Sequence, residues 1–219
     1  MWIDDSPEAL QAFLYLLAMG SCALAMGVPY PRAVAACLWY GWAALLNRNV
    51  LIANPGLAYV GWLLLACTLV TTETIRIGGK TVRIRLSSDT FPWLYWGAWT
   101  LVALGYSLSG LHKLDSPSWI DGSALRHVLQ NPLARDTPLV AWVLALPPIF
   151  LRVATWASLA LELLFFPLGL FWHTRRVFWC AMLGMHLGML LLVDFADLTL
   201  GVLIMHAFLF DARWLGCKV

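Results

Sequence analysis

The chain has 219 residues, of which 61% are hydrophobic and 12% are charged, and its mean hydropathy is +0.76. A soluble domain carries about 25% charged residues, so this composition excludes an ordinary soluble protein. The net charge of +2 says nothing about partners of a protein in lipid, and no run of basic residues indicates nucleic acid, so we expect no nucleic-acid partner. The 13 tryptophans fit the two aromatic belts of a membrane protein. We therefore expect one polytopic membrane domain over residues 1–219.

The acidic start of the chain, MWIDDSPE, lacks the positive charge that begins a cleaved signal peptide. The first apolar segment is therefore expected to remain as a helix. The cysteines lie far apart with no CxxC pair, which favours small apolar helix residues over a disulfide framework or a zinc site. They are Cys22, Cys37, Cys67, Cys180 and Cys217.

Apolar segments of about 20 residues are long enough to cross a bilayer. The sequence predicts seven such spans, at roughly 9–27, 31–47, 56–73, 92–112, 150–172, 176–194 and 197–213. The second and the last are short, and we expect them to be tilted or partly re-entrant.

Two shorter segments complete the predicted fold. TIRIGGKTVRIRL alternates polar and apolar residues around Gly78 and Gly79, which predicts a β-hairpin. TPLVAWVLALPP is too short to cross the bilayer and ends at Pro147 and Pro148, so we expect it to lie along the membrane interface. The predicted fold is all-α: a bundle of about seven transmembrane helices, an extracytoplasmic interfacial helix and a short cytoplasmic β-hairpin.

Lysine and arginine in short loops predict the orientation, because cytoplasmic loops carry more of them. With the N-terminus outside, nine lie inside: Arg32, Arg76, Lys80, Arg83, Arg85, Arg175, Arg176, Arg213 and Lys218. Five then lie outside: Arg48, Lys113, Arg126, Arg135 and Arg152. The sequence therefore predicts an extracytoplasmic N-terminus and a cytoplasmic C-terminus, in the inner membrane of a bacterium.

Three ionisable side chains lie deep in the predicted spans: Glu162, His186 and His206. At about 1.5 Å per residue, all three are placed near the bilayer midplane. A carboxylate at this depth is costly unless it is protonated or paired, so we expect a contact between Glu162 and a histidine. Such a contact is either a structural hydrogen bond or a proton relay, and the sequence favours neither.

Glycine and methionine residues flank His186 in the sequence. Gly184 and Gly188 form a GxxxG pattern, which predicts close helix packing. Methionine and histidine are also soft copper ligands. The residues in question are Met182, Met185, His186, Met189, Met205 and His206. Methionines at helical spacing are more often core residues, so no metal is favoured.

A second polar group lies at the predicted outer ends of the spans. Its members are Asn47, Arg48, Asn49, His112, Lys113, Arg152, Asp194 and Asp197. In a compact bundle they converge on one extracytoplasmic pocket, whereas a lone arginine at a helix end only reaches water. Lys113 follows Gly105 and Ser109 at small-xxx-small spacing, which predicts tight packing that buries its amine. A desolvated lysine loses its proton more readily and can act as a base.

The stretch YSLSGLHKLDSPSWIDGSAL resembles the signature of the horizontally transferred transmembrane (HTTM) domain. This domain is the membrane part of vitamin K-dependent gamma-carboxylases and their bacterial relatives. The matching residues are Ser109, Gly110, Lys113, Leu114, Trp119, Asp121 and Gly122. Segments 45–61, 152–176 and 183–211 are also similar to the family, so the resemblance covers most of the chain.

The resemblance implies that Lys113 is the base that deprotonates a reduced vitamin K ring, whose oxygenation then yields the base for carboxylation of glutamate. It also implies catalytic positions at His186 and Asn47, with a reduced quinone or vitamin K-like lipid as cofactor. The expected substrate-binding residues are His112, Arg48, Trp119, Asp121 and Arg152. The carboxylases carry a large extracytoplasmic region after the membrane part, whereas Val219 closely follows the last predicted span here. We therefore expect a separately encoded protein partner and a reaction other than glutamate carboxylation.

Three functions remain open. The first is a membrane enzyme in which Lys113 is the general base on a lipid-soluble or quinol-like substrate at the outer face. The second is a non-catalytic membrane subunit that anchors a protein complex, with Lys113 and Glu162 as members of structural ion pairs. The third is a metal-handling or small-solute transport protein. The third is favoured least, because the halves of the chain show no internal repeat.

Overall fold

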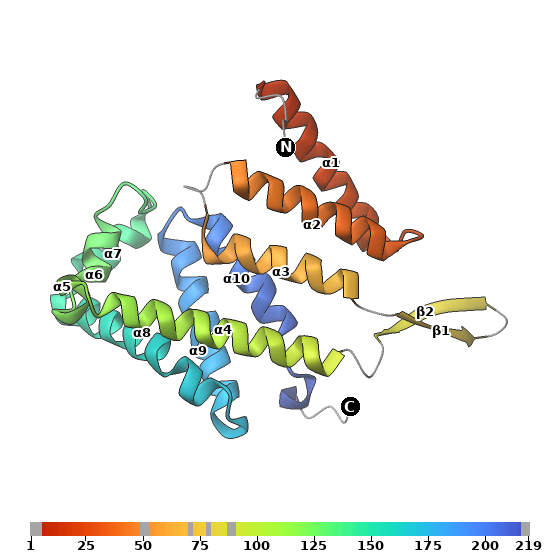
Figure 1. Cartoon of the computed structure of the whole chain (residues 1–219). Helices are drawn as coiled ribbons and strands as arrows, with labels where there is room; N and C mark the ends of the chain where they lie inside the picture. Colours follow the sequence, from red (N-terminus) through yellow and green to blue (C-terminus); the bar gives the residue numbers. More distant parts are fainter. Residues whose placement is uncertain (1–5, 49–52, 70–71, 78–79, 87–90, 216–219) are drawn as a thin grey trace. The chain divides into compact units, whose positions relative to one another are not determined.

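The computed structural model describes residues 6–48, 53–69, 72–77, 80–86 and 91–215, with helices as the dominant element (Figure 1). The chain divides into two compact units, Met1–Leu94 and Tyr95–Val219. The boundary between them lies near the start of the fourth long helix.

The first unit contains three helices. They are α1 (Pro7–Ala25), α2 (Pro31–Arg48) and α3 (Pro55–Leu69). Each begins at a proline, whose fixed φ suits the first turn of a helix and whose missing N–H is not needed there. The Ser6 hydroxyl accepts a hydrogen bond from the Ala9 amide and so caps α1. A turn with Gly27 at φ +79° and Tyr30 at φ 64° then leads into α2.

Helix packing in this unit leaves much apolar surface uncovered. α1 contributes no buried residue and exposes Leu16 and Met19, as a helix that faces lipid does. α2 contacts α3, where Trp42 donates its indole N–H to the Leu57 carbonyl at 2.8 Å.

Two strands, β1 (Thr72–Ile77) and β2 (Lys80–Leu86), pair antiparallel between α3 and the next helix. Ile77 is paired with Lys80 at the closed end of the ladder. The predicted glycine turn at 78–79 lies outside the described residues. The alternation of polar and apolar residues accounts for an extended conformation here.

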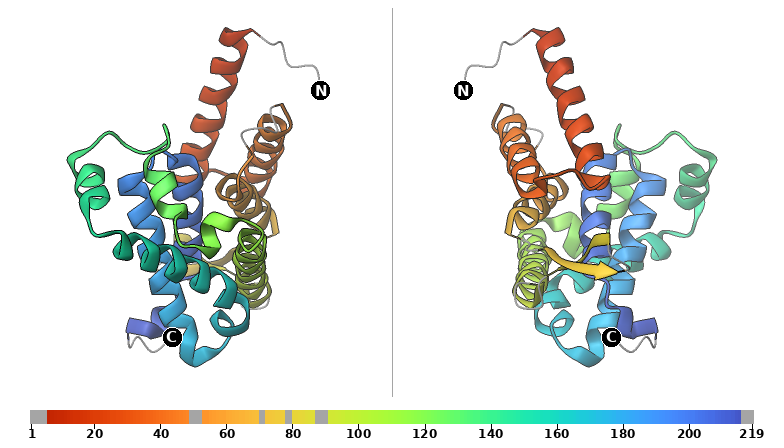
Figure 2. Two further views of the ribbon diagram at one scale, coloured as in Figure 1. Left: turned by 90° about the vertical axis from the view of Figure 1, so that its left-hand side faces the viewer. Right: turned by 90° about the vertical axis from the view of Figure 1, so that its right-hand side faces the viewer.

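The second unit is built mainly from four long helices. Three short helices, α5 to α7, connect α4 to α8, and a 3-10 helix, η2, follows α10. The bounds are α4 (Phe91–Lys113), α5 (Pro117–Ile120), α6 (Ala124–Leu129), α7 (Pro138–Ala145), α8 (Pro148–Gly169), α9 (Trp172–Leu192), α10 (Ala196–Phe208) and η2 (Ala212–Leu215). α9 contacts both α8 and α10, and the turn between α8 and α9 lies at the end of the unit remote from α5–α7 (Figure 2).

Two clusters form the core of the second unit. One is aromatic: Phe165 of α8 lies 6.0 Å from Trp99, 4.9 Å from Tyr106 and 6.0 Å from Phe178, measured between ring centroids. The other joins the short helices to α8 and the end of α9 through four buried side chains, Leu129, Val140, Leu151 and Val193. The short helices are therefore fixed to the long ones by apolar packing.

α4 and α8 approach closely at Gly110. A Cβ at this position would lie 2.9 Å from the backbone nitrogen of Leu163, so only glycine fits without a shift. The Ser107 hydroxyl lies nearby and donates to the Glu162 carbonyl at 3.0 Å. The prediction that Gly105 and Ser109 form the packing face was wrong, because Gly105 is exposed and Gly110 makes the contact one helical position away.

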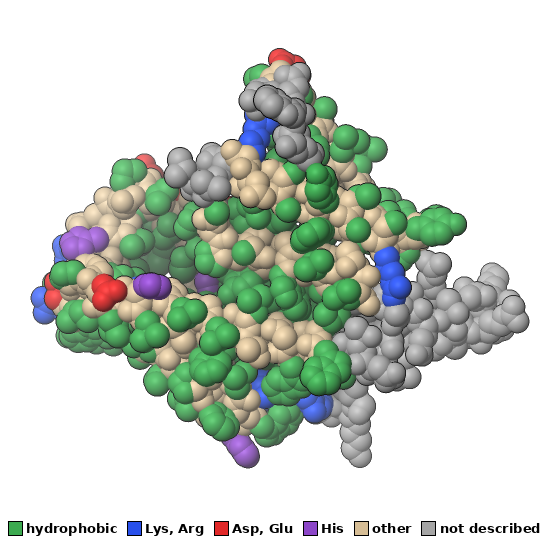
Figure 3. All heavy atoms as spheres, in the orientation of Figure 1, with side chains coloured by type: hydrophobic (Ala, Val, Ile, Leu, Met, Phe, Trp, Pro, Cys, Tyr) green, Lys and Arg blue, Asp and Glu red, His purple; other side chains and the backbone are tan. Residues whose placement is uncertain are grey.

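Each of the seven predicted spans contains a helix, but only some of these helices are long and apolar enough to cross a membrane. Within the described residues three meet that description, namely α1, α8 and α9, while α3 and α10 are shorter apolar helices. Large hydrophobic side chains such as Trp93, Leu108 and Phe150 are exposed on the long helices, and much of the surface in view is apolar (Figure 3). The structure is therefore compatible with contact to a lipid bilayer.

The segment of the predicted interfacial helix forms α7, which ends before Pro147 and exposes Trp142. The polar stretch before it contains two further helices, α5 and α6, which the sequence did not predict. These helices have only 4 and 6 residues, which is too short for a helical period to appear in the sequence.

Candidate functional site

The last residue of α4 forms an ion pair with the middle of α8. Lys113 Nζ lies 2.5 Å from Glu162 Oε1, and the two side chains are 24% and 7% exposed. The amine also lies 4.3 Å from the ring centroid of Trp119, a distance at which a cation is attracted to the face of an indole. Lys113 is thus held by one charge and one aromatic ring.

The local sequence explains why the lysine and the tryptophan meet. After Lys113 the chain turns, with the Leu114 amide bonded to the Leu111 carbonyl and the Ser116 amide to the Lys113 carbonyl. Pro117 then begins α5, whose third residue is Trp119. A cation at the C-terminus of α4 also complements the negative end of that helix.

The ion pair lies in the wall of a cavity of about 540 Å³ within the second unit. Most of the lining is apolar and comes from α6, α9 and α10, including Leu129, Met189 and Leu198. Lys113, Trp119 and Glu162 form one polar part of the wall, and His127, Asn131 and Ser158 add further polar groups. The site is therefore an apolar chamber in which an ammonium and a carboxylate are available.

Glu162 contributes one oxygen that no other described residue binds. Oε2 is buried and has no hydrogen-bond partner among the described residues. An unsatisfied buried acceptor costs free energy, so a ligand that donates a hydrogen bond at this position would be favoured.

A second buried polar cluster lies among α4, α9 and α10. The Tyr106 hydroxyl is 2.8 Å from His186 Nε2, and the ring centroids of His186 and His206 are 5.9 Å apart. His206 Nδ1 lies 3.0 Å from the Val202 carbonyl, which only accepts, so Nδ1 carries a proton. His186 Nδ1 and His206 Nε2 have no partner in the described part of the chain.

The expected contact between Glu162 and a histidine was therefore wrong. Oε1 pairs with Lys113, and His186 instead bonds to Tyr106. Neither His186 nor His206 lines the cavity, although Met185 and Met189 of α9 do.

The other predicted site residues lie outside this cavity lining. His112 and Arg152 are exposed, and the stem of Arg152 lies beside Gly122. Asp121 is also exposed, and its carboxylate accepts from the Ser123 amide at 2.8 Å. Hydrogen bonds from Ser123 lower the pKa of Asp121 below its usual value. These residues therefore form the surface around the short helices rather than the wall of the chamber.

Asn47 and Arg48 belong to the first unit, at the end of α2. Asn47 is exposed and its amide donates to the Ala43 carbonyl at 2.8 Å. Their predicted convergence with Lys113 remains a prediction. Asn49 of the same predicted group lies outside the described residues.

The GxxxG pattern of α9 does not form the close helix contact that was predicted. A Cβ at Gly184 or Gly188 would meet no described atom within 4 Å outside its own surroundings on the helix. Gly188 instead lines the cavity, whereas Gly184 does not. The absence of a side chain at Gly188 thus enlarges the chamber.

Sequence reasoning missed part of the site. His127, Asn131 and Ser158 line the cavity but were not named, because they lie outside the conspicuous motif and the predicted span ends. Tyr106 was named only as part of a family motif, and its hydroxyl is the partner of His186. Within the described residues, no group of three or more His, Cys, Asp or Glu side chains is placed to hold a metal ion.

No family model, curated protein or solved structure matches this chain.

Proposed function

We propose that the chain is an integral membrane enzyme in which Lys113 acts as a general base on a lipid-soluble, quinol-like substrate. The observation that carries this proposal is the Lys113–Glu162 pair in the wall of the 540 Å³ apolar cavity. Sites for small organic ligands have volumes of about 300–1,000 Å³ and combine apolar walls with a few polar groups. A fused aromatic ring and the start of an apolar tail fit that description.

The pair supplies a path for one proton. A ring hydroxyl beside Lys113 gives its proton to Nζ, while a proton already on Nζ moves to Glu162 Oε1, 2.5 Å away. The substrate becomes an anion, the amine remains an ammonium beside it, and the carboxyl becomes neutral. Burial at low dielectric favours this arrangement, because it keeps one opposite charge next to the new anion.

The membrane topology that we propose for the protein follows from the distribution of its basic residues. Seven spans with the N-terminus outside place Lys113 at the extracytoplasmic face and the β1–β2 hairpin inside. Membership of the HTTM family belongs to the same proposal and is supported by the motif from Tyr106 to Gly122. A separately encoded protein partner is part of the proposal as well.

The test is an anaerobic titration of detergent-solubilised protein with a short-chain 1,4-naphthohydroquinone. Its ring anion absorbs at longer wavelength than the neutral ring. We expect the anion band with wild type and its loss in Lys113→Ala. Lys113→Arg is the matched control, because arginine keeps the charge but does not release a proton. An anion band that persists in both variants would refute the role of Lys113 as a base.

A second candidate is a non-catalytic subunit that anchors a protein complex. It is favoured by the position of the ion pair, which joins α4 to α8 beside the close contact at Gly110. If the pair is only structural, the exchanged variant Lys113→Glu with Glu162→Lys keeps both stability and assembly. The enzyme proposal expects this folded variant to lose the anion band that wild type shows.

A further inference from the structure

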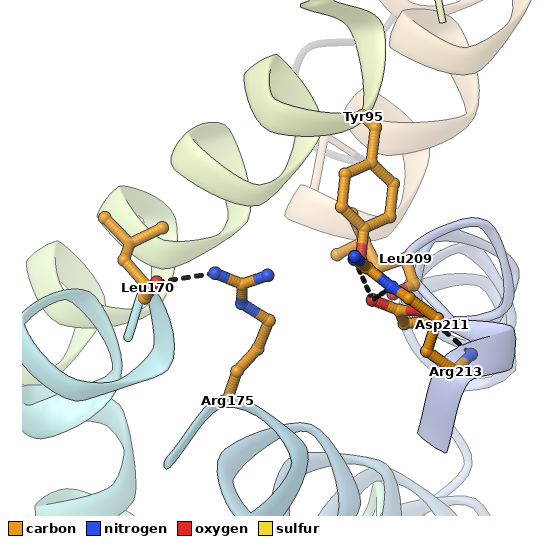
Figure 4. A network of polar contacts seen from close by, with 6 residues as sticks. All are labelled: Tyr95, Leu170, Arg175, Leu209, Asp211 and Arg213. Atoms are coloured by element: carbon orange, nitrogen blue, oxygen red, sulfur yellow. Dashed lines mark hydrogen bonds and ion pairs between the residues drawn. The ribbon is translucent and has the colours of Figure 1, made fainter. Parts of the chain in front are cut away.

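Arg175, in the first turns of α9, is a buried cation with unused hydrogen-bond donors. The residue is 3% exposed, and Nη2 donates to the Leu170 carbonyl at 2.6 Å (Figure 4). Nε and Nη1 are buried and have no hydrogen-bond partner among the described residues. Donors of a charged group that are buried without an acceptor are costly, so this arrangement calls for an acceptor that the described residues do not supply.

Indole rings surround this guanidinium. Arg175 Cζ lies 4.3 Å from the ring centroid of Trp96, 5.4 Å from Trp99 and 6.0 Å from Trp172. Such contacts attract the cation to the faces of the rings, but they do not accept the N–H groups in the guanidinium plane. The rings therefore hold the side chain in place and leave its donors open.

Among the described acidic groups, Asp211 attracts Arg175 electrostatically but forms its hydrogen bonds with Arg213. Asp211, which is buried, binds Arg213, with Nε 2.9 Å from Oδ1 and Nη2 2.6 Å from Oδ2. Figure 4 shows this pair beside Tyr95 and separate from the Arg175 side chain. Among the described residues, the guanidinium groups of Arg175 and Arg213 and the carboxylate of Asp211 sum to a net charge of +1.

The start of α9 adds further donors for an anion. The residue before the helix, Phe171, has no side chain that caps it. The Thr174 hydroxyl donates to the Leu168 carbonyl and so does not cap the helix either. The first amides of an uncapped helix have no intrahelical acceptor and lie at its positive end.

We propose that Arg175 and the start of α9 bind one phosphate-type oxyanion, supplied by the headgroup of an anionic phospholipid. Trp96 and Trp172, which are 44% and 50% exposed, have the character of residues at the membrane–water interface. In the proposed topology this end of the unit faces the cytoplasmic leaflet, where basic pockets between helices bind anionic headgroups. The site is independent of the chamber, because about 14 helical residues, or about 20 Å, separate Trp99 from Lys113 along α4.

Native mass spectrometry in a neutral detergent tests this proposal, with phosphatidylglycerol and phosphatidylcholine as the lipids. We expect wild type to retain one phosphatidylglycerol and no phosphatidylcholine. Arg175→Gln should weaken this retention about tenfold or more, the effect of losing a charged hydrogen bond. Arg176→Gln is the matched control, because it removes the same charge from the neighbouring residue, whose side chain is exposed.

Two results would overturn the proposal: equal loss of phosphatidylglycerol in both variants, or equal retention of phosphatidylcholine by wild type. If Arg175→Gln does not fold, Arg175→Lys replaces it, and unchanged retention in that variant also contradicts the proposal. A thermal-shift arm with inorganic phosphate distinguishes the sources of the oxyanion. Stabilisation by phosphate alone that equals that by the lipid assigns the site to free phosphate, and a much weaker effect assigns it to the headgroup.

Discussion

Lys113 at the end of α4 and Glu162 in the middle of α8 form an ion pair at 2.5 Å, although 49 positions separate them in the sequence. The glutamate is the more buried partner, at 7% exposed against 24%. An ion pair of this kind contributes little net stability as long as both charges are present, because burial of the charges offsets their attraction. Removal of one partner, however, leaves the other charge without compensation.

The first prediction concerns the asymmetry of this pair. Lys113→Met leaves a buried carboxylate and should lower the free energy of unfolding by about 3 kcal/mol. Glu162→Gln should cost less, because Lys113 retains access to water and the face of Trp119. The double variant Lys113→Met with Glu162→Gln should recover most of the loss, because it leaves no buried carboxylate. Reversible unfolding in mixed micelles measures all three, and additive losses in the double variant would show that the two side chains are not coupled.

The second prediction concerns the contact between α4 and α8. Gly110→Ala places a Cβ 2.9 Å from a backbone atom of α8, so the helices must separate, at a cost of about 1–3 kcal/mol. Gly105→Ala is the matched control on the same helix, because Gly105 is exposed. It should be neutral or slightly stabilising, since alanine favours a helix more than glycine does. A melting temperature that falls equally in both variants would contradict this packing.

The third prediction concerns the buried hydroxyl of Tyr106. Tyr106→Phe removes the partner of His186 Nε2 and leaves both ring nitrogens of a buried histidine without a hydrogen bond. The expected loss is about 1–3 kcal/mol in the free energy of unfolding. In a His186→Leu background the same tyrosine change should cost much less. If Tyr106→Phe lowers the free energy of unfolding equally in wild type and in His186→Leu, the two side chains are not coupled and the hydrogen bond is excluded.

The fourth prediction concerns acid stability at the end of the chain. Hydrogen bonds from Arg213 lower the pKa of Asp211 below its usual value. A carboxyl whose pKa is lower in the folded state adds stability above its unfolded pKa, and this stability is lost as the pH falls through the folded pKa. Wild type should therefore lose stability below about pH 4, the region in which unfolded aspartate takes up a proton.

Asp211→Asn should remove this part of the pH dependence. Asp136→Asn, which changes an exposed carboxyl, serves as the control and should retain it. Melting temperatures measured between pH 3 and pH 6 compare the three proteins, in the range where unfolded carboxyls titrate. The same acid dependence in wild type and Asp211→Asn would disprove the assignment.

The sequence identified the helical segments of this fold because apolar runs bounded by proline, glycine and polar residues have a clear local cause. The sequence also indicated Lys113 and Glu162 as candidate site residues, since charged side chains beside or inside apolar helices are unusual. It could not pair them, because the pairing depends on where α4 crosses α8. That crossing is set by Gly110 rather than Gly105, and the difference between these glycines is one of helical phase.

Burial of single charges was equally difficult to predict. Arg175 and Arg176 are neighbours in the sequence and both counted as loop cations, yet the structure buries the first and exposes the second. A rotation of about 100° per residue around α9 separates them. Contacts with Trp96 and Trp99 of α4, a helix far from α9 in the sequence, determine that Arg175 rather than Arg176 is buried.

The central claim is that the chamber beside Lys113 and Glu162 holds a lipid-soluble, ring-bearing molecule. The most direct measurement is organic extraction of purified wild type, Gly188→Leu and Gly184→Leu, with mass spectrometry of the extracted lipid. Both glycines have free space for a side chain, but only Gly188 lines the chamber. We predict one quinone-type lipid per chain in wild type and Gly184→Leu, and about a tenfold loss or more in Gly188→Leu. The absence of such a lipid from wild type, or its equal retention by the two variants, would contradict the claim.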